Sequence, residues 1–115
     1  MSSDELNELR KKIRFYETTL DNIYNGVMIT DPEGKIIFFS KNYGNFLGID
    51  PQGVIGKNCT EVIENTRMNV VAKTKIPEIN LPHRIMGQDM VVQRIPIEMN
   101  GELVAVFGQV MFKDV

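Results

Sequence analysis

Several residue types that build whole classes of functional site are scarce in this sequence. A single Cys excludes a disulfide within the chain and a zinc site made of four Cys. A single His excludes every site that needs a pair of imidazole ligands. The apolar runs are too short for a helix that spans a bilayer, and residues 1–12 lack the apolar stretch of a secretory signal. These absences predict a cytoplasmic protein in a reducing compartment, without a metal site or a membrane segment.

Charge and length narrow the classes further. The formal net charge is -2 at pH 7, which argues against direct nucleic-acid binding through a broad basic surface. The 115 residues suffice for one domain, and 43% hydrophobic with 24% charged residues is an ordinary globular composition. The sequence stops soon after an apolar run, without a polar tail, so we expect it to be a piece of a longer protein.

Residues 2–25 have the pattern of an amphipathic helix. Apolar residues recur at alternating spacings of 3 and 4, which is typical of a coiled-coil seam. Ser2 with Glu5 fits a capping box at the start, and Asn25-Gly26 is expected to end the helix. We therefore divide the chain into a helical unit, residues 1–25, and a domain, residues 26–115. The seam residues are Leu6, Leu9, Ile13, Tyr16, Leu20 and Ile23.

Charges beside this seam favour pairing with a second copy of the chain. In a parallel dimer Glu5 would face the partner's Arg10. Lys12 would likewise face the partner's Glu17, so both pairs have opposite signs. A helix that lies on its own domain shows the same apolar pattern, and one helix can do both. The two alternatives stay open at this point.

From residue 26 the pattern changes to strands and short helices. Asp31-Pro32-Glu33-Gly34 fits a type I turn, and Asn100-Gly101 and Gly87-Gln88 are expected to join hairpin strands. With strands at both ends and helices between them, the pattern predicts an α+β domain with helices over one face of an antiparallel sheet. Strands are expected at residues 27–30, 35–40, 81–86, 90–97 and 102–112, and helical turns at 41–47, 51–54, 59–63 and 67–75.

The expected strands carry apolar residues on both faces. In residues 35–40, Ile36 and Phe38 alternate with Ile37 and Phe39. A strand with one wet face should instead alternate apolar and polar residues. The short helices can cover only one face of the sheet. A second cover is therefore expected for the other face: the leading helix, a second copy of the chain, or both.

Three stretches of the chain together resemble the PAS sensory domain. They read GVMITDPEGKIIFFSKNYGNFLGI, GVIGKN and MGQDMVVQRIPIEMNGELVAVFGQVMFKDV. The order and spacing of their short motifs make the resemblance specific over residues 20–115. These motifs are Asp31 and Gly34 in the first turn, Asn42, Leu47-Gly48, Gly56, and Pro96-Ile97 before Asn100-Gly101.

Further motifs resemble a narrower group of PAS domains. ENTRM, QRIPI and VMFKDV are similar to PAS domains that precede the ATPase module of bacterial transcription activators working with sigma-N. The resemblance implies a five-stranded antiparallel sheet in the order 2-1-5-4-3, a small pocket between sheet and helices, and a homodimer through the N-terminal helix. It also implies an attached output domain, and this chain has no GxxxxGK[ST] loop of its own.

Strand alternation suggests which residues line that pocket. His83 shares a face with Ile85, and Gln93 shares one with Ile95. If these faces look inward, both polar groups lie in an apolar cleft, the usual make-up of a small-ligand site. The alternatives are that they are hydrogen-bonded core residues, or that His83 senses pH. The candidate ligand-binding residues are Phe46, Cys59, Met68, Val71, His83 and Gln93, while Arg67 and Arg94 could hold an anion but are expected on the solvated surface.

Cys59 follows Gly56-Lys57-Asn58, which resembles the start of the flavin-adduct motif of light-oxygen-voltage domains. The sequence then departs from that family, and Glu61 would repel a flavin phosphate. Haem-binding relatives carry their ligand on the helix that corresponds to residues 67–75, whereas His83 is expected on a strand. Both departures argue against flavin and haem, and no cofactor is required by the sequence. Cys59 then serves as a small buried hydrophobe.

These observations favour a non-catalytic sensory and dimerisation module. It would bind a small cytoplasmic ligand or a partner and regulate an attached output domain, that of a bacterial transcription activator. A histidine kinase or a cyclic-dinucleotide enzyme is the alternative output. A flavin photoreceptor and an enzyme with a Cys59–His83 dyad are the remaining hypotheses, and no further catalytic group is evident.

Overall fold

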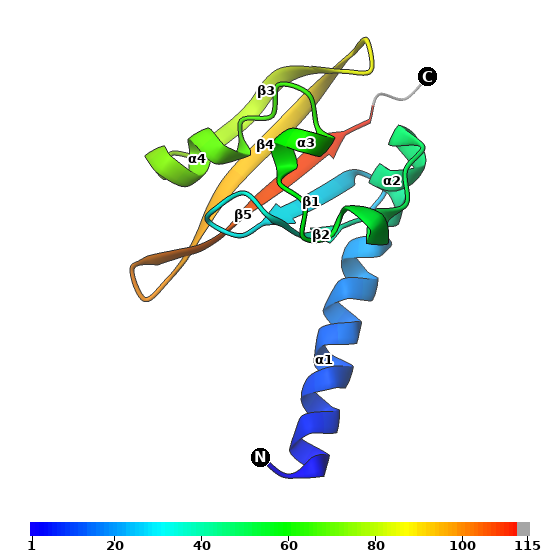
Figure 1. Cartoon of the computed structure of the whole chain (residues 1–115), viewed down its shortest axis with the longest axis vertical. Helices are drawn as coiled ribbons and strands as arrows, with labels where there is room; N and C mark the ends of the chain where they lie inside the picture. Colours follow the sequence, from blue (N-terminus) through cyan, green and yellow to red (C-terminus); the bar gives the residue numbers. More distant parts are fainter. Residues whose placement is uncertain (113–115) are drawn as a thin grey trace.

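The computed structural model describes residues 1–112 and consists of a sheet covered by short helices, with one long helix projecting from it (Figure 1). The helices are α1 (Ser3–Asp21), α2 (Lys41–Leu47), the 3-10 turn η1 (Pro51–Val54), α3 (Cys59–Val62) and α4 (Met68–Thr74). The strands are β1 (Gly26–Thr30), β2 (Ile36–Phe39), β3 (Glu78–Ile85), β4 (Gln88–Met99) and β5 (Glu102–Met111). Residues 113–115, which close the predicted domain and the VMFKDV motif, lie outside the described residues.

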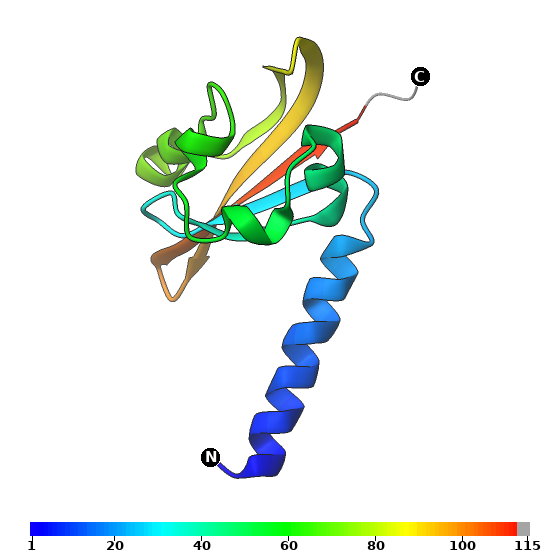
Figure 2. The same ribbon diagram turned by 45° about the vertical axis from the view of Figure 1, so that its right-hand side comes forward.

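The strands form one antiparallel sheet in the order β2-β1-β5-β4-β3, which confirms the predicted fold. The short helices α2, α3 and α4 gather on one face of it, here called the inner face (Figure 2). Buried Met28, Val92 and Val106 point from three strands toward these helices. Val71 of α4 and Ile63, which follows α3, complete this core.

The predicted start of α1 is confirmed, and its predicted end is wrong. Ser2 caps the helix, and its hydroxyl oxygen accepts a hydrogen bond of 3.1 Å from the Glu5 N–H. The helix ends at Asp21 rather than at Asn25-Gly26, and Asn22 is its C-cap, with a side-chain Nδ2 that donates to the Thr18 carbonyl at 2.8 Å. Gly26 instead opens β1, where a Cβ atom would lie only 2.8 Å from the Tyr43 ring. The glycine is thus required for close packing of the strand on α2.

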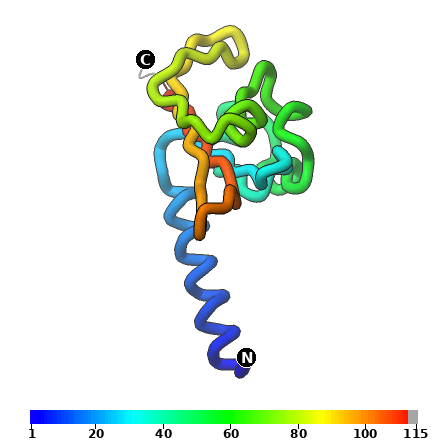
Figure 3. The backbone as a smooth tube through the Cα atoms, turned by 90° about the vertical axis from the view of Figure 1, so that its left-hand side faces the viewer, coloured from blue at the N-terminus to red at the C-terminus, as the bar shows by residue number. Residues whose placement is uncertain are grey.

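α1 leads away from the sheet instead of lying on it (Figures 1 and 3). None of its residues is buried, and seam residue Ile13 is 58% exposed. The side of α1 that faces β2 and η1 is polar and carries Arg14, Thr18 and Asp21. The alternative in which this helix covers its own domain is therefore wrong for this structure. No helix within residues 1–112 is long and apolar enough to cross a membrane.

The face of the sheet opposite the short helices, here called the outer face, is apolar, and its β4 side is exposed, whereas Val27 of β1 on the same face is fully buried. Val91 and Ile97 of β4 lie on it and are 37% and 39% exposed. Ile95, between them, pairs with Phe107 of β5. Gln93 pairs with Gln109 at the centre of this face, and both are half-buried. The prediction of strands that are apolar on both faces is confirmed, and within residues 1–112 the β4 side of the outer face has no cover.

The two sheet edges are finished in different ways. The β2 edge is occupied by a loop, since Ile36 exchanges backbone hydrogen bonds of 2.8 Å with Lys57 and Gly56. The β3 edge is open, and Met86-Gly87, with φ of 51° and 74°, joins β3 to β4 one residue earlier than predicted. In a two-residue hairpin the flanking residues are hydrogen-bonded to each other, so the alternation points the Pro82 nitrogen away from β4. Proline has no N–H, and the open edge therefore offers one donor fewer.

Candidate functional site

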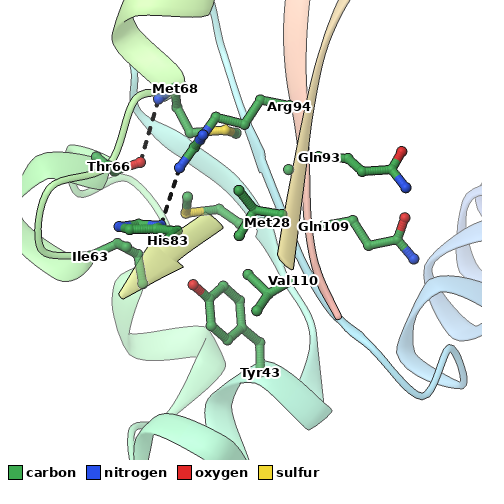
Figure 4. A pocket seen from close by; sticks show the side chains of 12 residues that line it. Met28, Tyr43, Ile63, Thr66, Met68, His83, Gln93, Arg94, Gln109 and Val110 are labelled. Atoms are coloured by element: carbon green, nitrogen blue, oxygen red, sulfur yellow. Dashed lines mark hydrogen bonds between the residues drawn. The ribbon is translucent and has the colours of Figure 1, made fainter. Parts of the chain in front are cut away.

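A small cavity lies between the inner face and the segment that joins α3 to α4. Its volume is about 20 Å³, which is room for one water molecule. Met28 and Met68 form apolar walls, and Tyr43, His83 and Arg94 bring polar atoms to it (Figure 4). As it stands, this cavity has no room for a flavin or a porphyrin ring. Within residues 1–112 no three His, Cys, Asp or Glu side chains are grouped to hold a metal ion.

Arg94 of β4 is the charged residue at the centre of this site. It is 4% exposed, because the alternation along β4 places it on the same face as buried Val92. Its Nη1 donates to Glu78 Oε1 at 2.9 Å, and its Nη2 donates to His83 Nδ1 at 3.1 Å. Glu78 is the residue directly opposite Arg94 on β3. The pairing of the strands therefore supplies the carboxylate that a buried guanidinium needs.

The two hydrogen bonds of His83 define its protonation. A guanidinium only donates, so Nδ1 must be the accepting nitrogen. Nε2 lies 2.9 Å from the Glu64 carbonyl oxygen and must carry the hydrogen. Burial, and then the charge of Arg94, lower the pKa of His83 below its ordinary value. The ring is therefore neutral, and it ties the α3–α4 segment to β3 and β4.

Glu78 joins the two arginines of the site. Arg67 Nη2 donates to its Oε2 at 2.7 Å, while Arg94 binds its Oε1. The hydrogen bond from Arg67 is the main reason why the pKa of Glu78 lies below its ordinary value. With His83 neutral, two guanidinium groups face one carboxylate. Both arginines are therefore already paired, and the Glu64 carboxylate adds a second negative charge near His83.

Tyr43 brings the remaining polar group. Its ring stacks on Phe39 with centroids 4.7 Å apart and planes 6° from parallel. The Ser40 hydroxyl caps α2 by accepting from the Tyr43 N–H, and this fixes where the ring enters the core. The phenol oxygen points toward the cavity between His83 and Met28 (Figure 4). Burial raises the pKa of Tyr43, so the hydroxyl keeps its proton.

Comparison with known proteins shows which family has this architecture. A family model described as PAS fold matches residues 14–104, which is most of the chain. The chain belongs to the PAS fold family. "Sensor protein CitS" of Halalkalibacterium halodurans is 26% identical over 102 residues, which are 87% of this chain and 19% of that protein. The PAS domain thus spans about a fifth of the length of this curated relative.

Solved structures support the fold of this PAS domain. It matches a chain of the E. coli DhaR(N)-DhaL complex with a TM-score of 0.79 and 17% identity, over 96% of this chain and 38% of that one. It matches the PAS domain of histidine kinase ThkA with a TM-score of 0.67 and 15% identity, over 78% of this chain and 100% of that one. At these identities the likeness is one of fold.

Two of the six predicted pocket residues lie at the PAS cavity with their side chains. Met68 and His83 line it. Gln93 contributes only backbone, because its side chain points to the outer face beside Gln109 (Figure 4). The assumption that the apolar face of Val91, Ile95 and Ile97 looks inward is therefore wrong.

The other three predicted pocket residues lie elsewhere. Val71 is buried in the core, and Phe46 packs on Phe112 with ring centroids 4.9 Å apart. Cys59 is buried at the start of α3, and its Sγ is 3.8 Å from Asn58 Oδ1. Burial raises the pKa of the Cys59 thiol, and His83 is engaged by Arg94 and Glu64. The structure therefore contradicts the hypothesis of a Cys59–His83 dyad.

The most buried charge of the site, on Arg94, was not predicted from the sequence. Arg94 was expected on the solvated surface, and Glu78 and Tyr43 were not singled out. Arg94 follows Gln93 on β4 and so lies on the opposite face of the strand. Assigning that face as the inner one would have identified Arg94 as a cavity residue. The cross-strand partner Glu78 would then have followed from the pairing of β3 with β4.

Proposed function

We propose that this PAS domain is a non-catalytic sensory and dimerisation module that regulates an output domain attached to it in a longer, cytoplasmic protein. The observation that carries the proposal is the direction of α1. Its apolar seam is exposed from Leu6 to Tyr16 and half-buried at Leu20, and its polar side faces its own domain. Seam residue Ile23 is half-buried and lies just beyond the end of the helix. A seam of this kind is covered when a second copy supplies the same seam.

The charges beside the seam support a parallel homodimer. In the in-register parallel arrangement, Glu5 lies opposite the partner's Arg10 and Lys12 lies opposite the partner's Glu17, and both pairs are attractive. Each exposed pair contributes only about 0–1 kcal/mol, so the pairs select the register while the apolar seam supplies stability. The seam residues proposed as the dimer interface are Leu6, Leu9, Ile13, Tyr16, Leu20 and Ile23.

The outer face also needs a cover, and α1 of the same chain does not supply it. Val91 and Ile97 are more than a third exposed there. A second copy brought close by paired α1 helices is the proposed source of that cover. The cover and the seam would then be parts of one interface.

The cavity is the proposed sensory site. His83, Arg94 and Tyr43 direct polar atoms into it, and Met28 and Met68 are flexible enough to enlarge it. A ligand larger than a water molecule requires such a movement. Met68 and His83 remain the predicted ligand contacts that lie at the cavity, and Arg94 joins them.

Two kinds of attached output domain are proposed, and a different observation supports each. The motifs ENTRM and QRIPI support a sigma-N-dependent transcription activator. The match to a sensor protein, and the similar fold of the PAS domain of a histidine kinase, support a sensor kinase. The coding sequence after Val115 separates them: a GxxxxGK[ST] loop supports the activator, and a phosphoacceptor His ahead of an ATP-binding kinase domain supports the kinase.

Sedimentation equilibrium of the wild type and of Ile13→Asp tests the dimer. We expect a dimer for the wild type and a monomer for Ile13→Asp, because a buried unpaired charge cannot be accommodated in the seam. Thr18→Asp is the matched control, since it adds the same charge on the polar side of α1 and should leave the dimer intact. A monomeric wild type, or equal dissociation of both variants, would contradict the proposal.

A further inference from the structure

The first turn of α2 touches both the cavity and the junction with α1. Tyr43 reaches the cavity with its hydroxyl. The preceding residue, Asn42, turns the other way, and its Nδ2 donates to the carbonyl oxygens of Ile23 at 2.6 Å and Tyr24 at 3.3 Å. These two carbonyls belong to the segment between α1 and β1. Two consecutive residues of α2 therefore have different contacts: Tyr43 lines the cavity, and Asn42 is hydrogen-bonded to the segment that connects α1 to β1.

A further hydrogen bond ties α2 to the last residue of α1. The Lys41 N–H, at the start of α2, donates to Asp21 Oδ1 at 3.0 Å. Asp21 thus offers a carboxylate to the N-terminal end of α2, where backbone N–H groups lack helical partners. Asp21 and Asn42 together define a polar joint between α1 and α2.

We propose that α2 is the lever through which the cavity sets the direction of α1, with Tyr43 as its inner contact and the Asp21–Asn42 joint as its outer one. The inference deepens the proposed sensory function and rests on it. An occupant that displaces Tyr43 moves the first turn of α2, and Asn42 and Lys41 carry the movement to the end of α1.

Close packing prevents the displacement from being absorbed beside Tyr43. A Cβ atom on Gly44 would lie 2.6 Å from Pro51 Cγ, and one on Gly26 would lie 2.8 Å from the Tyr43 ring. α2 therefore contacts η1 and β1 without spare room. A densely packed element shifts as a unit when one of its side chains is pushed.

α1 has room to respond. A groove of about 450 Å³ separates it from β2 and η1, and Arg14, Thr18 and Ile37 are among the residues that line it. Since no residue of α1 is buried, the joint is its main attachment within residues 1–112. The 19 residues of α1 span about 28 Å, so a tilt of about 10° at the joint moves the far end by about 5 Å. A small shift of α2 is thus enlarged at the proposed dimer seam.

Double electron–electron resonance between α1 and the domain tests the lever. The chain carries Cys59→Ala, and spin labels are attached at Glu8→Cys on α1 and Glu102→Cys on β5, both exposed positions. Labelled protein is mixed with an excess of unlabelled protein, so that each oligomer holds one labelled chain at most. The measurement therefore succeeds whether or not the chain dimerises, and failure of the lever is distinct from failure of the dimer.

The perturbation at the cavity end is Tyr43→Leu, with Tyr43→Phe as a second variant that keeps the ring stacked on Phe39. We expect the mean label distance to shift by about 3 Å, or its distribution to broaden by as much, when Tyr43 is changed and the joint is intact. In a background of Asp21→Ala with Asn42→Ala the joint is broken. There the same change at Tyr43 should add no further shift.

Val71→Ala is the control for general loosening, since Val71 is fully buried on α4, an element outside the proposed route. It should leave the label distance unchanged. An unchanged distance in both Tyr43 variants would overturn the lever. So would an equal response to Val71→Ala, or a Tyr43 effect that persists after the joint is broken.

Discussion

Arg94 donates a hydrogen bond of 3.1 Å to His83 across neighbouring strands, and it does so from a position that is 4% exposed. The bond is possible only while His83 Nδ1 is unprotonated. The hydrogen bond from the permanently charged Arg94 guanidinium thus depends on the protonation state of the His83 ring. Protonation of Nδ1 therefore breaks this contact.

The first prediction concerns pH. Because folding lowers the pKa of His83 below its ordinary 6.5, the unfolded chain takes up this proton first as the solution becomes acidic. The stabilisation is complete above pH 6.5 and is lost as the pH falls from there toward the lower folded pKa. His83→Gln, whose amide can still accept from Arg94 and donate to Glu64, should flatten this part of the profile. Urea unfolding at about pH 7.5 and about pH 5.5 measures the difference.

Glu78 changes its contribution to stability in a lower pH range, so between about pH 7.5 and 5.5 the experiment measures the effect of His83. Its pKa lies below the ordinary 4.5, so its contribution is present above 4.5 and disappears as the pH falls further. His83→Gln should leave this lower window unchanged. An identical pH profile for wild type and His83→Gln between about pH 7.5 and 5.5 would contradict the assignment of His83 as a neutral acceptor.

The second prediction is that Glu78→Gln lowers the free energy of unfolding by about 2–3 kcal/mol. The substitution leaves the buried Arg94 guanidinium without a carboxylate and also releases Arg67. Glu61→Gln, at an exposed position, is the matched control and should change stability by less than about 0.5 kcal/mol. Equal urea midpoints for both variants would show that Arg94 finds another partner.

The third prediction concerns the cavity wall at Gly108 of β5. A Cβ atom there would lie 2.9 Å from Met68 Sδ and 3.3 Å from the Met28 carbonyl oxygen. Gly108→Ala should therefore push Met68 into the cavity and cost about 1–3 kcal/mol of stability. At Gly53 the nearest atom to a Cβ is 3.7 Å away, so Gly53→Ala should be neutral or slightly stabilising in the same urea experiment.

The fourth prediction concerns the open sheet edge. Pro82→Val restores a backbone N–H that points away from β4, and it adds a residue that favours strands. Self-association beyond the wild-type assembly should increase, as measured by light scattering against concentration. Pro82→Lys restores the same N–H but adds a charge on the edge, so it should scatter less than Pro82→Val. Equal scattering by wild type and Pro82→Val would show that the edge is protected in another way.

The fold was predictable because its signals are local. Asn100-Gly101 takes the positive φ angles of a two-residue hairpin, and Ser2 caps α1 as its side chain predicts. The end of α1 was not predictable from Asn25-Gly26, because this glycine is needed for close contact with Tyr43 and the helix is capped earlier, at Asn22.

The site was predictable only in part because it depends on which face of β4 is inner. Both faces are apolar, so periodicity could not choose between Gln93 and Arg94, and the choice of Gln93 placed the wrong side chain in the cavity. The ion pair of Arg94 with Glu78 joins residues on different strands, and its register is set by the whole sheet. Met68 was found because α4 has one clear buried face, and His83 was found because it shares a face of β3 with buried Ile85.

The amides of Gln93 and Gln109, side by side on the outer face, restrict what can cover it. A purely apolar surface would leave the donors and acceptors of both amides without hydrogen-bond partners, and each unsatisfied group would weaken the contact. A fitting surface must therefore offer complementary polar atoms at that one place, and sliding it by a residue would lose them. The pair thus gives an otherwise apolar surface specificity for one alignment of its partner and disfavours non-specific aggregation.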